Sequence, residues 1–550
     1  MLPSSIRASV SPDTIDRVGR LFNNTLDDVL NELLQNARRA SATRVEITLT
    51  RGDRVILSIS DDGQGIADPE SVLTLGRSDW GDDVSAREDP AGMGMFSLAG
   101  HSVTITSRHA AHSLAWSAEI PADAWDGSQA IPLYEADHPI GTTIDIQIPA
   151  DWDDHLDRLA ASAAFHYPLP VTFNGTDCPR KDWLAEAVHI ARWNGCRIGV
   201  FEGSLRHLNA TLNFHGLTIP CKLPTVSEIR GGGAYYVRVD IIDAPALQLV
   251  LPARKEAVEN AALRELRDAA ERTIYEAIAI KGRHCLAFKE WSRAAKIGVN
   301  LLEAEAQLIS WFPSSADWDT CYGQAKLIDA ANAIVVEEGE PPVEQCVARA
   351  LKSSPLRGQM VDPQPDFAGY SWYDALAQLG NFRFEIEHDG GCFTLTDGST
   401  VPPLAGDVKA STITLRADLK DRGKLYPISA ETDIVLASDP DFISNLDELR
   451  IIYLSTLPVD DLVDLLDAGY FCPSDDVASD SWDTQHRRFE ADARDRAIKL
   501  LRGPDEAICD QFRCLVRDNR WIVPTGSRLA ITRADDDITV TLTRESASVS

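Results

Sequence analysis

The sequence predicts an α+β protein with several domains. Residues 14–40 carry apolar side chains at helical spacing. Residues 44–50 (RVEITLT) and 54–60 (RVILSIS) have the β-branched composition and apolar pattern of strands. The chain has 550 residues, which at about 150 residues per domain corresponds to three or four domains. A helix followed by paired strands therefore opens a chain long enough for several cores.

The composition is that of an acidic globular protein. Apolar residues make up 44% and charged residues 25%, which is ordinary for a folded chain. No apolar run approaches the roughly 18 residues of a membrane span, and the N-terminal residues contain no secretory core. We therefore expect a cytoplasmic protein without a membrane partner. The net charge of −31 repels phosphate backbones, so nucleic acid is the weaker expectation for a partner, although a basic groove is compatible with this total.

The first predicted domain, residues 1–150, continues with a glycine-rich turn, a loop, a short helix and two strands. The turn DDGQGI directly follows the second strand, and the polar stretch 79–91 predicts a loop. A short helix is expected over 94–100, and strands over 103–107 and 142–148. This order indicates a sheet with a helical layer on it.

A second α+β block is predicted over residues 151–285. It contains strand patterns at 171–175, 210–220 and 235–242, and a helical pattern from 257 to about 281. For residues 286–550 the sequence predicts a C-terminal region of mixed helices and strands, which forms one domain or two subdomains. Nothing in this last region indicates a role.

The helix over 14–40 carries a polar pair that suits phosphate chemistry. Glu32 and Asn36 are four residues apart and therefore share a face of the helix. An amide oxygen can ligate Mg²⁺ that phosphates already hold, and a carboxylate beside it can orient and deprotonate a water. By itself, such a pair is more often an exposed Glu and a capping Asn.

Asp61 and the glycines after it suit recognition of a purine base. The Asp61 carboxylate can accept a hydrogen bond from an exocyclic amine, and Gly63 and Gly65 allow the backbone to approach the base closely. Taken alone, this segment is more often a plain hairpin turn.

Two later segments can complete such a site. Gly92 and Gly94 precede a predicted helix, whose free N–H groups can bind phosphate. Thr142 follows Gly141 at the start of a strand, and its hydroxyl can reach Asp61 through a water. Taken alone, each segment is more often an ordinary junction between elements.

Together and in this order, the four segments resemble the motifs of the GHKL ATPase superfamily, which includes DNA gyrase, the ninety-kilodalton heat-shock chaperones, histidine kinases and MutL. The resemblance covers residues 14–150 and implies a Bergerat-type nucleotide-binding fold. ATP and Mg²⁺ are then the expected cofactors. The resemblance implies that Glu32 is the catalytic base, that Asn36 is the Mg²⁺ ligand and that Asp61, Gly63 and Gly65 bind adenine. It also implies that Gly92 and Gly94 wrap the phosphates and that Thr142, in the late Gly-Thr pair, belongs to the nucleotide-binding site.

A stretch of the second block resembles the middle domain of the chaperones. LPARKEAVEN, residues 251–260, places Arg254 six residues before Asn260. The resemblance implies that Arg254 is a catalytic residue that reaches the γ-phosphate, with Lys255 as the substitute; a guanidinium can bind phosphate through two hydrogen bonds. The plain alternative is a basic surface pair at the start of a helix. The pattern at 171–175 also resembles the transducer domain of gyrase, MutL and the chaperones.

Two positions depart from the family pattern. The family often carries Asp three residues after the Asn of the helix, where this chain has Arg39, preceded by Arg38. The glycine motif of the chaperones opens with an additional Gly, where this chain has Asp89. These departures leave the metal and phosphate contacts open and favour slow or partner-dependent hydrolysis.

The resemblance implies an ATPase in which nucleotide-driven lid closure changes the conformation, with a chaperone-like or defence-related role in protein remodelling, a protein client and an ATP-dependent homodimer. Two alternatives stay open: a nucleotide-gated binding or scaffold protein with little turnover, and a DNA-acting ATPase like gyrase or MutL. The net charge disfavours the second alternative. A histidine kinase is the weakest interpretation, because only 31 residues precede Glu32, too few for the usual phosphoacceptor helices.

Overall fold

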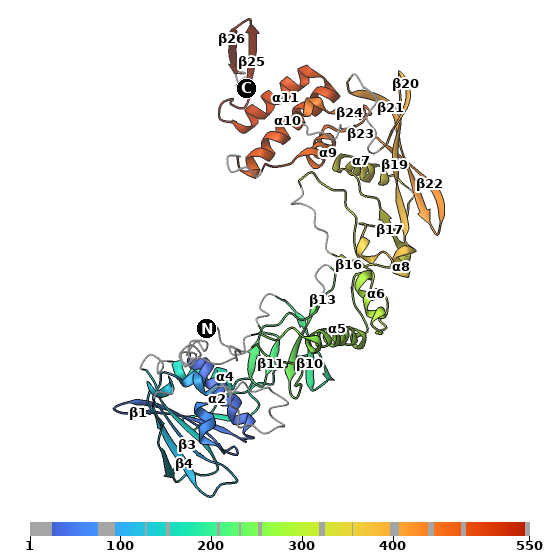
Figure 1. Ribbon diagram of the computed structural model, residues 1–550. Coiled ribbons are helices and arrows are strands. Elements are labelled where there is room, and N and C mark those ends of the chain that lie inside the picture. The colour runs from blue at the N-terminus through green and yellow to red at the C-terminus, as the bar shows by residue number, and fades with distance from the viewer. Residues whose placement is uncertain are drawn as a thin grey trace, which may run out of the picture. The chain divides into compact units, whose positions relative to one another are not determined.

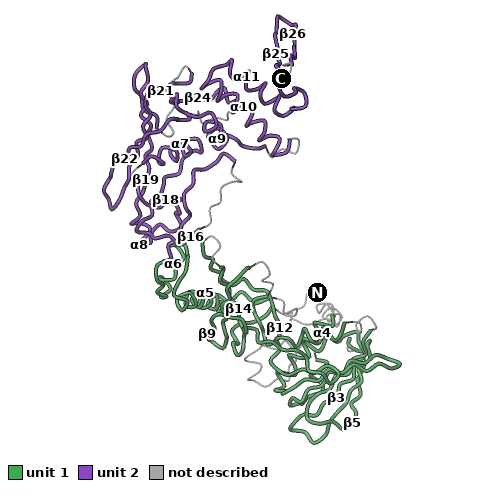
Figure 2. The backbone as a smooth tube through the Cα atoms, turned by 180° about the vertical axis from the view of Figure 1, so that it is seen from behind, with its two compact units in different colours: residues 1–304 green, residues 305–550 purple. Residues whose placement is uncertain are grey.

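In the computed structural model the chain divides into two units, residues 1–304 and 305–550 (Figure 2). None of the helices in the described part of the chain is both long and apolar enough to cross a membrane. The predicted domain boundaries at 150 and 285 lie inside the first unit and stay predictions. The structure describes residues 25–74, 94–126, 129–149, 155–205, 210–229, 233–250, 256–317, 325–354, 356–396, 406–437, 445–474 and 480–544.

Helix α2 (Leu26–Arg39) is the first described element, and its ends follow the usual capping chemistry. The Thr25 hydroxyl oxygen accepts a hydrogen bond from the Asp28 N–H at 3.3 Å. Acidic residues lie in the first turn, and Arg38 and Arg39 lie in the last turn, as the helix dipole favours. The predicted helix is thus confirmed from Leu26 onward, and residues 14–24 lie outside the described residues.

An eight-stranded sheet lies beneath α2 (Figure 1). The order of its strands is β5-β4-β3-β6-β2-β1-β7-β8. Helix α4 (Leu156–Ala164) contacts α2 on the same layer. Leu30 and Leu34 of α2 pack with Ile47, Leu57 and Ile105 of the sheet in one buried core, and burying each of these side chains contributes roughly 1.5–3 kcal/mol. The strands are β1 (Val45–Arg51), β2 (Val55–Asp61), β3 (Val103–Arg108), β4 (Ala115–Ile120), β5 (Leu133–Ala136), β6 (Gly141–Gln147), β7 (Val171–Phe173) and β8 (Thr176–Asp177).

Strand β7 differs from the sequence prediction, which placed 171–175 in the second block. It pairs in parallel with β1, with Val171 opposite Val45. Strands β4 and β5 were absent from the prediction. The predicted helix at 94–100 is the short 3₁₀ helix η2 (Gly94–Leu98), and the predicted loop at 79–91 lies outside the described residues. The first sheet therefore extends past residue 150 in the chain.

The described residues in the rest of the first unit form a second, six-stranded sheet and two helices. The order is β12-β11-β14-β10-β9, with β13 beside β14. Helix α5 (Ala261–Lys281) begins at its cap Asn260, whose side chain accepts from the Leu263 N–H at 2.9 Å, and it ends at Gly282 in the left-handed conformation. Its apolar face packs on this sheet. The other elements are β9 (His189–Trp193), β10 (Cys196–Gly203), β11 (Leu212–Phe214), β12 (Leu217–Ile219), β13 (Thr225–Ser227), β14 (Ala234–Ile241) and α6 (Phe288–Lys296).

The second unit is also α+β, which agrees with the mixed pattern of the sequence. Its main sheet has eight strands, six of them in the order β18-β17-β19-β21-β24-β23, and a separate hairpin, β25–β26, ends the described chain. Helices α7 and α9 pack on the same core as this sheet. The principal elements are β17 (Ala333–Val336), α7 (Pro341–Leu351), β18 (Gln359–Val361), β19 (Ala377–His388), β20 (Gly391–Thr396), β21 (Val408–Asp421), β22 (Lys424–Thr432), β23 (Ile434–Ala437), β24 (Arg450–Tyr453), α9 (Val459–Tyr470), α10 (Trp482–Arg502), α11 (Pro504–Asp518), β25 (Ser527–Ala534) and β26 (Asp537–Arg544).

Candidate functional site

Helix α2 brings Glu32 and Asn36 together with a third side chain, Arg39. The Arg39 Nη1 atom lies 3.2 Å from the Asn36 Oδ1 atom and 3.7 Å from the Glu32 Oε1 atom. Residues 32, 36 and 39 are spaced by one helical turn each, so their side chains share a face. Glu32 and Arg39 are each only 8% exposed. The polar face of α2 is therefore a buried, paired cluster rather than a solvated surface.

The main chain at Gly94 lies directly against this cluster. A Cβ atom added at Gly94 would overlap the Glu32 carboxylate and would lie 2.8 Å from the Glu32 Cγ atom. The next residue, Met95, places its sulfur 4.0 Å from the Asn36 Nδ2 atom. The structure therefore brings Gly94 of the predicted glycine motif to Glu32 and Asn36. Gly92, the other predicted glycine of this motif, lies outside the described residues.

Asp61 ends strand β2 and is largely removed from water. Its Oδ1 atom accepts a hydrogen bond of 2.8 Å from the Gly63 N–H. Burial raises the pKa of Asp61 to about 6, against the lowering effect of the Gly63 hydrogen bond, and the charge of Asp62 adds to the increase. Asp62 itself points to Thr43, whose N–H donates to it at 2.7 Å. The two adjacent carboxylates thus have different surroundings.

The glycines after Asp61 are required by close approaches of the backbone. A Cβ at Gly63 would lie 2.7 Å from the Ala40 Cβ atom at the end of α2. Gly65 has a φ of +75°, and a Cβ there would overlap the Arg108 carbonyl. The Gln64 N–H between them donates to the Ala40 carbonyl at 2.8 Å. The turn is therefore held between the end of α2 and the end of β3, which places Asp61 in the same region as the α2 cluster.

Thr142 lies opposite Asp61 in the antiparallel pairing of β2 and β6. Its hydroxyl is 3.0 Å from the hydroxyl of Ser107, which donates to the Gly141 carbonyl at 3.0 Å and accepts from the Ile66 N–H at 2.9 Å. Since the single proton of Ser107 goes to Gly141, the Thr142 hydroxyl donates to Ser107. Sequence reasoning missed Ser107; the signal was a serine at a buried position of a β-branched strand.

Two further residues that sequence reasoning missed connect α2 to its surroundings. Tyr167, which is 3% exposed, donates from its hydroxyl to the Leu34 carbonyl at 2.5 Å, and burial raises the pKa of this phenol. Gln35 is 5% exposed, and its Nε2 atom donates to the His215 carbonyl at 2.9 Å. His215 lies in the turn between β11 and β12. The helix that carries Glu32 is therefore bonded to the second sheet.

Arg254 and Lys255 lie outside the described residues, so their predicted roles stay predictions. The residues that flank them are joined, because the Val250 N–H donates to the Glu256 carbonyl at 2.8 Å. Asn260, which closes the stretch LPARKEAVEN, is the cap of α5 and donates to the Ala246 carbonyl. The capping role explains this Asn without a ligand.

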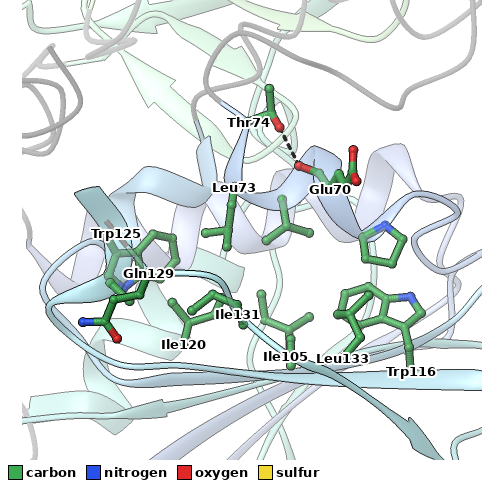
Figure 3. A pocket seen from close by; sticks show the side chains of 14 residues that line it. Glu70, Leu73, Thr74, Ile105, Trp116, Ile120, Trp125, Gln129, Ile131 and Leu133 are labelled. Atoms are coloured by element: carbon green, nitrogen blue, oxygen red, sulfur yellow. Dashed lines mark hydrogen bonds between the residues drawn. The ribbon is translucent and has the colours of Figure 1, made fainter. Parts of the chain in front are cut away.

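An apolar pocket of about 300 Å³ lies between β3–β5 and the 3₁₀ helix η1 (Pro69–Leu73) (Figure 3). Trp116 and Trp125 form part of its wall, and the Trp125 Nε1 atom donates to the His101 carbonyl at 3.0 Å. None of the predicted site residues lines this pocket. It is therefore separate from the cluster built by α2, Asp61 and Gly94.

Comparison with known proteins concerns the same part of the chain. Residues 23–151 match the family model described as "Histidine kinase-, DNA gyrase B-, and HSP90-like ATPase". This range contains α2, the turn after Asp61, and Gly94. The GHKL resemblance and the α+β fold class predicted from the sequence are thus confirmed.

Among the curated proteins, DNA mismatch repair protein MutL of Aeromonas hydrophila subsp. hydrophila is 32% identical over 127 residues, which are 22% of this chain and 20% of that protein. The MutL protein of Aliivibrio salmonicida is 36% identical over 126 residues, which are 22% of this chain and 19% of that protein. The matches thus span about a fifth of the length of these relatives. A solved structure, the Aquifex aeolicus MutL ATPase domain complexed with ADP, is 16% identical, covers 40% of this chain and 92% of that chain, and has a TM-score of 0.25.

Proposed function

Since residues 23–151 form a histidine kinase-, DNA gyrase B- and HSP90-like (GHKL) ATPase domain, we propose that this protein binds ATP at the cluster of α2, Asp61 and Gly94 and hydrolyses it slowly. The observation that carries the proposal is the contact between Gly94 and Glu32. These residues are 62 positions apart in the chain, and the approach leaves no room for a side chain at Gly94. Phosphate transfer benefits from a site that excludes bulk water. The close packing of Gly94 on the buried Glu32 carboxylate supports such a site.

The adenine end of the proposed site is Asp61 with the Gly63–Gly65 turn. A carboxylate at the end of β2 accepts a hydrogen bond from the exocyclic amine of the base. Thr142 lies opposite Asp61 in the sheet and supports the same end. Gly92 and Gly94 are assigned to the phosphate end, where small residues let main-chain N–H groups approach the phosphate oxygens.

In the proposed reaction, the Glu32 carboxylate takes a proton from a water molecule. The water oxygen attacks the γ-phosphorus, and the bond between this phosphorus and the β,γ-bridging oxygen breaks, which leaves ADP and inorganic phosphate. Arg254, or Lys255 in its place, is assigned to the γ-phosphate, where a cation stabilises the charge of the transition state.

The predicted Mg²⁺ site at Asn36 does not fit the arrangement of α2. The Asn36 Oδ1 atom, which would be the ligand, accepts a hydrogen bond from Arg39. The proposed reaction therefore contains no step that depends on a metal at Asn36.

The test is a pair of measurements on the wild-type protein and on Glu32→Gln: calorimetry for ATP binding, and single-turnover hydrolysis of labelled ATP. Glu32→Gln is expected to bind ATP and to hydrolyse it about 100-fold more slowly or worse, as expected for loss of a general base. Glu46→Gln, an exposed Glu on β1, is the matched control and should behave as wild type. Equal rates in Glu32→Gln and wild type would remove Glu32 as the base. ATP binding without hydrolysis in the wild type would leave a nucleotide-gated binding or scaffold protein. Absence of ATP binding to the wild type would refute the whole proposal.

We propose that the conformational change driven by the nucleotide remodels other proteins, in a chaperone-like or defence-related role. We place this activity in the cytoplasm. An ATP-dependent homodimer is expected, and sedimentation with a non-hydrolysable ATP analogue would detect it.

A DNA-acting role is the second candidate, because the relatives named above are mismatch repair proteins. The net charge of −31 counts against it. Binding to duplex DNA that weakens steeply with salt would favour the DNA-acting role over protein remodelling.

A further inference from the structure

One guanidinium nitrogen of Arg39 contacts both Glu32 and Asn36. Nη1 of Arg39 is the atom that approaches the Asn36 amide oxygen at 3.2 Å and the Glu32 carboxylate at 3.7 Å. Both charged side chains are almost fully buried. The Glu32–Asn36 pair therefore helps to hold this cation in place.

The charge of Arg39 is permanent, because a guanidinium does not lose its proton in a protein. A Mg²⁺ ion bound to the Asn36 oxygen would lie at about 2.1 Å from it, and so would stand beside the Arg39 guanidinium. Two cations at that separation repel each other, and the repulsion is strong where water is excluded. In this arrangement the Asn36 oxygen already accepts from Arg39, so a metal on its other lone pair would be held against the repulsion of that fixed cation.

We infer that Arg39 takes the place of the metal ion on Asn36, and that ATP therefore binds to this protein with little dependence on Mg²⁺. The inference rests on the proposed function. The guanidinium supplies positive charge to the region of the phosphates, and guanidinium groups bind phosphate oxygens well. It also balances the buried Glu32 carboxylate, which would otherwise be costly to keep out of water.

The neighbouring Arg38 provides a matched comparison. Its Nε atom lies 3.4 Å from the Gln35 Oε1 atom, and its side chain is half-buried. Residue 38 does not share the helix face of residues 32, 36 and 39. Removal of either arginine lowers the charge of the chain by one. Of the two, Arg39 is the one with described contacts to Glu32 and Asn36, so we expect its removal to alter that pair.

The experiment measures the dissociation constant of ATP by calorimetry, in excess Mg²⁺ and in EDTA. For the wild type and Arg38→Ala, removal of Mg²⁺ is expected to change the dissociation constant by less than about threefold. For Arg39→Ala and the neutral, polar Arg39→Gln, affinity in EDTA is expected to fall about tenfold or more below that in Mg²⁺. Circular dichroism of each variant establishes that it is folded.

Two results would overturn the inference: a wild type that loses about tenfold or more of its affinity in EDTA, or folded Arg39 variants that respond to EDTA no more than wild type. If neither Arg39 variant folds, the wild-type comparison alone decides. If the proposed function itself is wrong, the result is a different one: the wild type then binds ATP neither in Mg²⁺ nor in EDTA. ATP binding that is strong only with Mg²⁺ would overturn the role of Arg39 and leave the nucleotide site in place.

Discussion

The Tyr167 hydroxyl donates a hydrogen bond of 2.5 Å to the main-chain carbonyl of Leu34, in the middle of the helix that carries Glu32 and Asn36. Tyr167 lies between α4 and β7, about 130 positions further along the chain. A carbonyl oxygen has two lone pairs, so this bond adds to the helix without replacing a bond of its ladder. The contact fixes the position of α2 by a partner outside the helix.

Tyr167→Phe is expected to loosen α2, because it removes this one oxygen and nothing else. The free energy of local opening of the helix should fall by about 0.5–1.5 kcal/mol, the usual contribution of one hydrogen bond. Hydrogen exchange of the α2 amides, followed by mass spectrometry, measures this quantity directly. Tyr134→Phe is the control, since Tyr134 is 55% exposed. Equal exchange in the two variants would show that the Tyr167 bond does not stabilise α2.

Gly94→Ala is expected to abolish ATP hydrolysis, because its Cβ would displace the Glu32 carboxylate. Overpacking of this kind should also lower the free energy of unfolding by about 1–3 kcal/mol. Single-turnover hydrolysis and thermal unfolding are the measurements. Gly52→Ala serves as control, because a Cβ there meets only the Arg54 carbonyl, at 3.9 Å. Normal turnover in Gly94→Ala would mean that Glu32 is not held by the glycine motif.

The affinity for adenine is expected to depend on pH through Asp61. Burial raises the pKa of this carboxyl to about 6, so the folded protein holds a proton that the unfolded chain releases. Asp61 therefore favours folding at low pH, and this contribution is lost as the pH rises through about 6. Adenine binding needs the ionised form of Asp61, because only the carboxylate accepts freely from the adenine amine. Binding should thus strengthen from about pH 5 to about pH 7 and release a proton.

Calorimetry with adenosine, in buffers that differ in ionisation enthalpy, counts that proton without interference from titrating phosphates. Asp62→Asn is the comparison. The charge of Asp62 adds to the raised pKa of Asp61, so its removal should shift the proton release to lower pH without abolishing it. Adenosine binding with no proton release near pH 6 would speak against Asp61 as the acceptor.

Arg254→Ala is expected to leave ATP binding nearly normal and to slow hydrolysis by about tenfold or more, as for a cation that acts on the transition state. Lys255→Ala is the comparison and should hydrolyse normally if Arg254 is the sensor. The reverse pattern would transfer the role to Lys255. Normal turnover in both variants would mean that this stretch contains no γ-phosphate sensor.

The fold of the first domain could be predicted to the extent that it depends on local pattern. The spacing of Leu30 and Leu34 indicates helix α2, and the glycines after Asp61 indicate a tight turn. Long-range pairing was not predictable in this way: residues 171–175 show a strand pattern, but the parallel pairing of β7 with β1 depends on the intervening chain.

The residues of the candidate site were likewise predictable only where they depend on local pattern. Glu32, Asn36 and Asp61 follow from motif spacing, whereas Ser107 and Tyr167 act through partners that are distant in sequence. Arg39 was identified as a departure from the family pattern. Its joint contact with Glu32 and Asn36 required the rotamers of all three side chains, and sequence spacing does not specify rotamers.

The bond from Gln35 to the His215 carbonyl has a mechanical consequence. Glu32, Gln35 and Asn36 lie within one and a half turns of a rigid rod, so a displacement of the two outer residues also displaces the middle one. If nucleotide binding tilts or rotates α2, the β11–β12 turn must either follow or release its hydrogen bond. A shift of about an ångström at the phosphates would thereby be passed to the second sheet through one amide group.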